Sequence, residues 1–154
     1  MYVGVIGAGQ CDNKLAEVAY KVGKEIAQNG AILVCGGLGG VMEAACRGAK
    51  GAGGLTVGIL PSKTRKYANS FVDVAIPTGM AEARNALVVG ASDVVIAIGG
   101  EFGTLSEIGL ALKMGRFVVG IETWELNKEG EPIEAIISAS GPSEAVSKAL
   151  QLIR

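Results

Sequence analysis

The stretch VVIAIGGEFGTLSE (Val94–Glu107) joins a buried strand, a glycine turn and the start of a helix. Its first five residues are all apolar, as in a strand that is covered on both faces. The glycine pair Gly99-Gly100 permits a tight turn before the helix begins. The stretch ILVCGGLGGVME (Ile32–Glu43) repeats this plan. Both stretches therefore predict a parallel strand that leads through a glycine turn into a helix.

Short apolar runs alternate with helical segments along the rest of the chain. We expect strands at Tyr2–Gly7, Ala31–Cys35, Leu55–Leu60, Phe71–Ile76, Asp93–Ile98 and Arg116–Ile121, and a short last strand within Ile133–Ser138. We expect helices at Lys14–Gln28, Val41–Lys50, Met80–Ala91, Thr104–Met114 and Pro142–Ile153, and a loop at Trp124–Glu131. This alternation predicts an α/β fold with a doubly wound parallel sheet, Rossmann-like, in three α/β/α layers. We expect one nucleotide-binding domain over residues 1–154.

Composition and charge limit the partners of the chain. Of its 154 residues, 49% are hydrophobic, and 14 basic against 15 acidic residues give a net charge of −1. Such a balance gives no general attraction to nucleic acid or to an anionic membrane. The sequence shows neither a signal peptide nor an apolar run that could span a bilayer. We therefore expect a cytoplasmic protein with no nucleic-acid or membrane partner.

The inventory of reactive side chains is short. Histidine is absent, which excludes histidine-based triads and histidine-ligated metals. The three cysteines, Cys11, Cys35 and Cys46, have no CxxC spacing, and buried reduced thiols are the expected state. We expect no metal site.

Ligands of doubly wound sheets bind at the carboxyl ends of the strands. Two glycine turns at this edge would direct two helix N-termini at one crevice, which is an anion site. Gly7-Ala8-Gly9 begins a dinucleotide fingerprint, but Asp12 takes the third glycine position, and Asp12 could equally cap the following helix. We expect the ligand to be bound by Gly7, Ala8, Gly36, Gly37, Gly39, Gly40, Gly99, Gly100, Glu101, Gly103 and Thr104.

Two charged residues near this edge have alternative interpretations. Thr104 and Glu107 fit T-x-x-E, a capping box in which the pair would only stabilise the helix start; catalysis by Glu107 is the alternative. Arg84 lies near the start of a predicted helix, where the helix dipole disfavours a cation. It could clamp a phosphate or carboxylate, or it could simply be exposed to solvent.

The motifs GGLGGVMEAACRGA, GMAEARN and GGEFGTLSE together resemble the LOG-like superfamily, often labelled lysine decarboxylase-like. Well-studied members of that superfamily are phosphoribohydrolases, which cut nucleoside 5′-monophosphates into base and ribose 5-phosphate. The resemblance implies that Arg84 and Glu107 are the catalytic pair and that Thr104 and the glycine turn hold the 5′-phosphate. It implies no required cofactor. Lysine decarboxylation would need a pyridoxal Schiff-base lysine, which no feature of the sequence marks.

The chain departs from the superfamily pattern at two places. Asn85 follows Arg84 where the superfamily has Lys, and Gly99-Gly100-Glu101 stands where it has Pro-Gly-Gly. The compact chain resembles a short branch that includes molybdenum-cofactor carrier proteins, which bind a phosphate-bearing pterin. The alternative function is therefore a non-catalytic carrier of molybdenum cofactor or a related nucleotide-like ligand.

Glu101 is the residue that least suits a phosphate turn. A carboxylate 4 Å from a phosphate costs about 1 kcal/mol or more. Glu101 must therefore turn away, pair with a base, or face a different ligand. The resemblance and the apolar or small residues on most faces of Met80–Ala91 and Leu105–Met114 also lead us to expect a homodimer or higher homo-oligomer.

Overall fold

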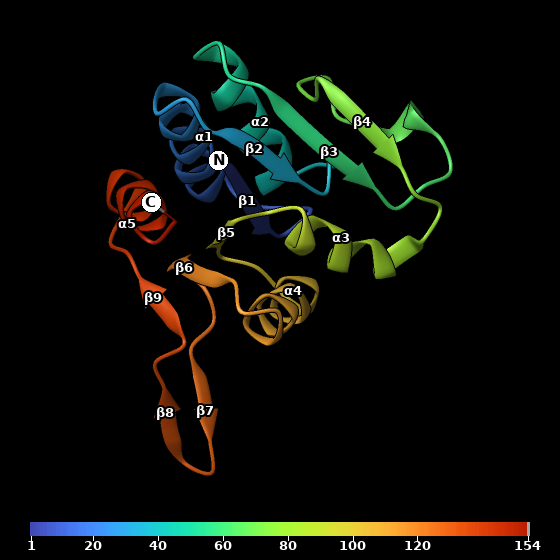
Figure 1. The fold of residues 1–154 in the computed structure, drawn as a ribbon. Coiled ribbons are helices and arrows are strands. Elements are labelled where there is room, and N and C mark those ends of the chain that lie inside the picture. Colours follow the sequence, from blue (N-terminus) through green and yellow to red (C-terminus); the bar gives the residue numbers. More distant parts are fainter. Residues whose placement is uncertain (154) are drawn as a thin grey trace.

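A computed structural model describes residues 1–153 as one seven-stranded parallel sheet between two layers of helices (Figure 1). The strand order is β4-β3-β2-β1-β5-β6-β9, and every neighbouring pair is parallel. The strands are β1 (Tyr2–Gly7), β2 (Ile32–Cys35), β3 (Thr56–Leu60), β4 (Val74–Pro77), β5 (Val94–Ile98), β6 (Phe117–Ile121) and β9 (Ile136–Ser138). The chain winds outward from β1 to β4 and then returns to β5. The predicted doubly wound fold is confirmed.

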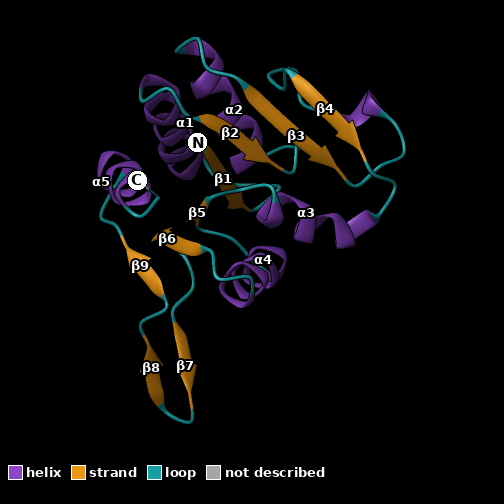
Figure 2. Cartoon of the chain, in the orientation of Figure 1, coloured by secondary structure: helices purple, strands orange, loops and turns teal. Residues whose placement is uncertain are grey.

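Helices cover both faces of this sheet (Figure 2). One layer holds α1 (Asn13–Gln28), α2 (Val41–Gly51) and α5 (Pro142–Gln151). The other layer holds α3 (Asn85–Gly90) and α4 (Phe102–Lys113). Each layer buries its own apolar cluster against the sheet, which explains why the strands are apolar at successive positions. Across residues 1–153, each helix is too short or too polar to span a bilayer.

The start of α1 shows how local sequence fixes an element. Asp12 Oδ1 accepts a hydrogen bond of 2.8 Å from the backbone N–H of Leu15, which confirms Asp12 as the N-cap. The helix then buries Ala19, Val22 and Ile26 along one side. This cap sets the course of the chain directly after the first strand-to-helix loop.

Two predicted boundaries were wrong for local reasons. The helix expected at Met80–Ala91 is a short 3-10 turn, η2 (Ala81–Arg84), followed by α3, because Ala81 has a positive φ of 49°. A second 3-10 turn, η1 (Arg65–Tyr67), follows β3. The strand expected from Phe71 begins only at Val74, and the carbonyl of Phe71 before it accepts a hydrogen bond of 2.6 Å from Thr56 Oγ1.

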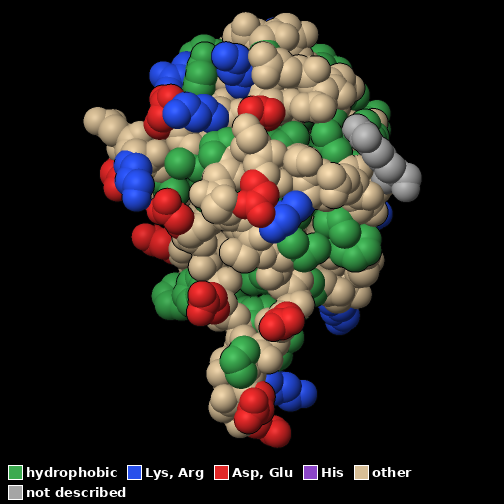
Figure 3. Space-filling model, turned by 90° about the vertical axis from the view of Figure 1, so that its left-hand side faces the viewer, with side chains coloured by type: hydrophobic (Ala, Val, Ile, Leu, Met, Phe, Trp, Pro, Cys, Tyr) green, Lys and Arg blue, Asp and Glu red, His purple; other side chains and the backbone are tan. Residues whose placement is uncertain are grey.

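The segment that was expected to be a loop forms an antiparallel hairpin of β7 (Leu126–Lys128) and β8 (Glu131–Ile133). Glu129 and Gly130 at its turn both have positive φ, 55° and 87°, as two-residue hairpin turns require. The hairpin projects from the body of the molecule and exposes acidic side chains (Figure 3). Its strands bury little, so they lack the apolar pattern by which a strand is predicted.

Candidate functional site

A cleft of about 590 Å³ opens at the carboxyl ends of β1, β2 and β5. Strand connections run in opposite directions from β1 and β5, so the cleft lies at the switch point where doubly wound sheets bind ligands. Its size suits a small-molecule ligand. The residues that line it are Val5, Ile6, Gly7, Ala8, Gly9, Gln10, Gly36, Leu38, Met42, Pro61, Ala81, Glu82, Arg84, Asn85, Glu101, Gly103, Thr104 and Glu107.

Most of the residues expected at the site line this cleft, but several glycines do not. Those that line it are Gly7, Ala8, Gly36, Arg84, Glu101, Gly103, Thr104 and Glu107. Those outside the lining are Gly37, Gly39, Gly40, Gly99 and Gly100. Two of these shape the turns instead. A Cβ on Gly40 would overlap the carbonyl of Ala8, and a Cβ on Gly100 would overlap the side chain of Thr104.

Two helices begin at the cleft, as the repeated glycine turns predict. The Val41 N–H at the start of α2 donates to the carbonyl of Ala8 over 3.1 Å, which packs the loop after β1 against this helix. Neither Gly40 nor Glu101, the N-cap positions of α2 and α4, caps its helix with a side-chain hydrogen bond. Backbone N–H groups at both helix starts therefore favour an anion.

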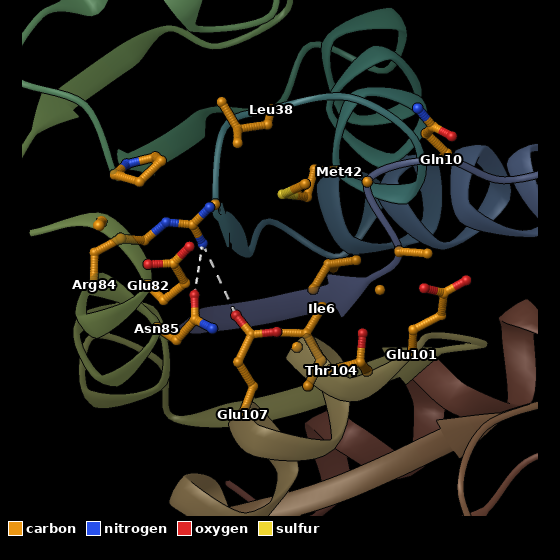
Figure 4. A pocket seen from close by; sticks show the side chains of 18 residues that line it. Ile6, Gln10, Leu38, Met42, Glu82, Arg84, Asn85, Glu101, Thr104 and Glu107 are labelled. Carbon is orange, nitrogen blue, oxygen red and sulfur yellow. Dashed lines mark hydrogen bonds and ion pairs between the residues drawn. The ribbon is translucent and has the colours of Figure 1, made fainter.

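The capping-box interpretation of Thr104 and Glu107 is wrong. Helix α4 begins at Phe102, so Thr104 is its third residue and cannot be its N-cap. The turn ends earlier than expected because Gly99 and Gly100 both have positive φ, 53° and 105°. Glu107 instead points from the second turn of α4 toward Arg84 (Figure 4).

Arg84 and Glu107 form a buried, loosely paired couple. Arg84 Nη1 lies 4.0 Å from Glu107 Oε1, and each side chain is only 9% exposed. The interpretation of Arg84 as solvent-exposed is therefore wrong. Burial raises the pKa of Glu107 to about 7, although the positive charge of Arg84 acts in the opposite direction. Burial likewise lowers the pKa of Arg84, and Glu107 opposes this.

The guanidinium of Arg84 has a hydrogen-bond donor that lacks a partner in the described part of the chain. Nη1 donates to Asn85 Oδ1 over 3.1 Å, whereas Nε is buried and has no hydrogen-bond partner within residues 1–153. Gly36 makes room for this group, because a Cβ there would lie 2.3 Å from Nη1. A buried cation with donors to spare suits an oxyanion ligand.

Glu101 is exposed and lines the cleft. Its carbonyl accepts hydrogen bonds from Trp124 Nε1 at 3.1 Å and from the Leu105 N–H at 3.0 Å. Within residues 1–153 its carboxylate has neither an ion-pair nor a hydrogen-bond partner. Within residues 1–153, Glu101 is therefore not paired with a base. The two explanations left are that its carboxylate turns away from a phosphate or that the ligand is a different one.

Sequence reasoning missed several lining residues, of which Gln10, Met42 and Glu82 are examples. Gln10 directly follows Gly7-Ala8-Gly9, but no pattern in the sequence marks its side chain as a ligand contact. Met42 fits the apolar face of a helix equally well. Glu82 sits in a helical turn whose direction only the tertiary structure defines.

Two of the three thiols are buried next to each other, and one of them, Cys35, directly precedes the cleft residue Gly36. Cys35 and Cys46 are buried with their Sγ atoms 3.5 Å apart, while Cys11 is half-buried, and all three are free. The expectation of buried thiols therefore holds for Cys35 and Cys46. The hydrogen bond with Cys46 lowers the pKa of the Cys35 thiol, and burial acts against it.

The family of the chain follows from comparison with known proteins. The SLOG cluster4 family matches residues 1–146. The chain belongs to this family. An uncharacterized protein of Archaeoglobus fulgidus is 47% identical over 147 residues, which cover 96% of this chain and 93% of that protein.

Solved structures agree with the family. The molybdenum cofactor binding protein of Rippkaea orientalis has a TM-score of 0.89 and 37% identity, covering 99% of this chain and 97% of that one. The molybdenum cofactor carrier protein of Chlamydomonas reinhardtii has a TM-score of 0.86 and 34% identity, covering 98% and 97%. The DNA processing protein A of Helicobacter pylori, at 21% identity and a TM-score of 0.73, shares the fold alone. Two of these full-length likenesses are to proteins described as binding or carrying molybdenum cofactor, and they support the carrier alternative better than the hydrolase expectation.

Proposed function

We propose that this chain binds molybdenum cofactor, or a closely related phosphate-bearing pterin, in the cleft and carries it without chemical change. The observation that carries the proposal is the full-length likeness to two proteins described as binding or carrying this cofactor. The cleft supports it independently. It offers two helix starts, a buried guanidinium with an unpaired N–H, and a volume suited to a small ligand.

In this proposal each part of the cleft has a separate task. Arg84 and the N–H groups at the start of α2 attract the anionic groups of the ligand. Ile6, Leu38 and Met42 supply apolar contact for a flat ring. Thr104 contributes a hydroxyl that can donate or accept. The cofactor is cargo here, and its own chemistry takes place on the protein that receives it.

Phosphoribohydrolase activity is the second candidate, because the Arg84–Glu107 couple favours it. Glycosidic cleavage builds positive charge on the sugar, and a carboxylate buried in a cleft can stabilise that charge or orient water. A pKa of about 7 makes Glu107 able to exchange a proton near neutral pH. The same geometry also suits simple binding, so activity must be measured directly.

Retention of the cofactor tests the carrier proposal. The protein is incubated without oxygen with molybdenum cofactor released from a molybdoenzyme and then passed through a gel-filtration column. We expect molybdenum and pterin to elute with the protein, and Arg84→Ala to abolish retention. Arg47→Ala is the matched control, because Arg47 is exposed on α2 and stacks over Tyr20 away from the cleft. Free elution of the cofactor from the native protein would refute the proposal.

Release of ribose 5-phosphate tests the hydrolase. Native protein and Glu107→Gln are incubated with several nucleoside monophosphates. Turnover that disappears in Glu107→Gln would establish the hydrolase. Retention of the cofactor with no turnover would leave the carrier.

A further inference from the structure

The charges of the cleft are unevenly distributed between its two ends. Its lining holds one cation, Arg84, and three carboxylates, Glu82, Glu101 and Glu107. Glu82 and Glu107 lie at the Arg84 end, whereas Glu101 lies at the other end, with Ile6 and Thr104 between (Figure 4). Two carboxylates are thus offset by a nearby guanidinium, and the third faces the cleft without a base.

The Arg84 end is the place for the anionic part of a ligand. The side chain of Arg84 is about nine-tenths buried, its Nε lacks a partner, and its ion pair with Glu107 is stretched to 4.0 Å. An oxyanion that reached this guanidinium would supply the missing acceptor. A phosphate placed beside Glu101 would instead meet an uncompensated carboxylate. This polarity reverses the orientation that the superfamily resemblance implies, in which the glycine turn beside Glu101 holds the phosphate.

We propose that Glu101 recognises the N–H edge of a 2-amino-4-oxo pyrimidine ring, the edge that pterins and guanine share. On this edge a ring N–H and an exocyclic amino group lie side by side and point the same way. The two oxygens of a carboxylate accept such a pair together, as they do from arginine. Adenine places an acceptor at the corresponding ring nitrogen, which a carboxylate repels. The inference rests on the proposed binding of a phosphate-bearing ring in this cleft.

Three nucleotides test the proposal, because they share the ribose phosphate and differ at this edge, with AMP also carrying an amino group in place of the neighbouring ring oxygen. GMP has both donors, IMP has the ring N–H alone, and AMP has an acceptor in its place. Calorimetry in EDTA should rank the affinities GMP, then IMP, then AMP, with GMP about 10- to 100-fold tighter than AMP. In Glu101→Gln the GMP and AMP affinities should come within a few fold of each other. Ribose 5-phosphate, which has no ring, should bind both proteins almost equally.

Glu131→Gln is the matched control. Glu131 is an exposed glutamate of β8 that does not line the cleft, and its substitution removes the same charge. The control should keep the full preference for GMP. Its loss there would mean that net charge, and not recognition by Glu101, sets the preference.

Other results would overturn the inference. AMP binding as tightly as GMP to the native protein would refute recognition of the donor edge. A Glu101→Gln variant that binds all four probes more tightly would mean that Glu101 only repels phosphate. Binding that requires Mg²⁺ and vanishes in EDTA would mean that Glu101 holds a cation. If molybdenum cofactor is retained but GMP is not preferred, this inference fails while the carrier proposal survives. If GMP is preferred through Glu101 but the cofactor is not retained, the carrier proposal alone fails.

Discussion

Arg84 Nη1 and Glu107 Oε1 lie 4.0 Å apart at one end of the cleft, and both side chains are buried. At this separation the two charges attract each other without a hydrogen bond between them. Neither charge is fully compensated, which is unusual for a buried pair in a stable core. The couple is better suited to admit a third polar group than to stabilise the fold.

The buried carboxyl of Glu107 should make the protein less stable as pH rises toward neutrality. Its pKa is about 7 in the folded chain, against 4.5 as the ordinary value. Between these values the folded chain holds a proton that the unfolded chain has lost, so the unfolding free energy falls as pH rises. The total loss is on the order of 3 kcal/mol and is complete above pH ~7.

Urea unfolding of native protein and Glu107→Gln from pH 5 to pH 8 measures this effect. Glutamine does not titrate, so the unfolding free energy of the variant should lack the decrease with pH that Glu107 causes. The difference in stability between the two proteins should therefore shift in favour of the variant as pH rises. A difference that stays constant with pH would show that Glu107 ionises normally.

Ionisation of Glu107 should also weaken binding of anions at the Arg84 end. Sulfate is a suitable probe because it keeps its charge from pH 6 to pH 8. An ionised carboxylate near the anion should lower sulfate affinity by about tenfold across this range. Calorimetric titration should show this loss in the native protein and a flat profile in Glu107→Gln. Equal pH dependence in both proteins would place the titrating group elsewhere.

Gly36 should be needed for the position of Arg84. A Cβ at this residue would lie 2.3 Å from Nη1 and 2.7 Å from Cζ, so Gly36→Ala must displace the guanidinium. Because a side-chain end can move more easily than backbone, we expect a stability loss of only about 1 kcal/mol. Sulfate affinity should fall by about tenfold or more through the lost charge-assisted contact.

Gly109→Ala is the control for Gly36→Ala. Gly109 lies within α4, a Cβ there meets open space, and alanine should be neutral or stabilise the helix by up to ~1 kcal/mol. Sulfate binding should be unchanged in this control. Unchanged binding in Gly36→Ala as well would mean that Arg84 does not depend on the space above Gly36.

The sheet could be predicted from the sequence because parallel strands that are buried on both faces leave long apolar runs. The glycine turns after β2 and β5 could also be predicted, because each directly follows such an apolar run. The start of α4 was misplaced because Thr104 is a good N-cap by type, whereas the positive φ at Gly99 and Gly100 moves the start to Phe102.

The proximity of Arg84 and Glu107 could not be read from their spacing. Arg84 ends η2 and Glu107 lies in α4, and only the packing of this segment against α4 brings the two together. The residue types of Arg84 and Glu107, and the motif that they resemble, suggested a pair. Their burial depends on the surrounding fold, and so does the raised pKa of Glu107. The position of Glu101 opposite Arg84 is likewise a property of the folded cleft.

Association through the α3 and α4 side of the sheet remains a prediction. Leu87 in α3 is 42% exposed and Met80, just before η2, is 46% exposed. Exposed aliphatic side chains of this size favour self-association when they form a patch. We expect light scattering to give the mass of a dimer or larger assembly, and Leu87→Glu to reduce it toward that of the monomer. Ile133→Glu introduces the same charge at a residue of the hairpin with equal exposure, 42%, and should leave the mass unchanged. Dissociation by Ile133→Glu alone would move the interface to the hairpin, and a monomeric native protein would refute the prediction.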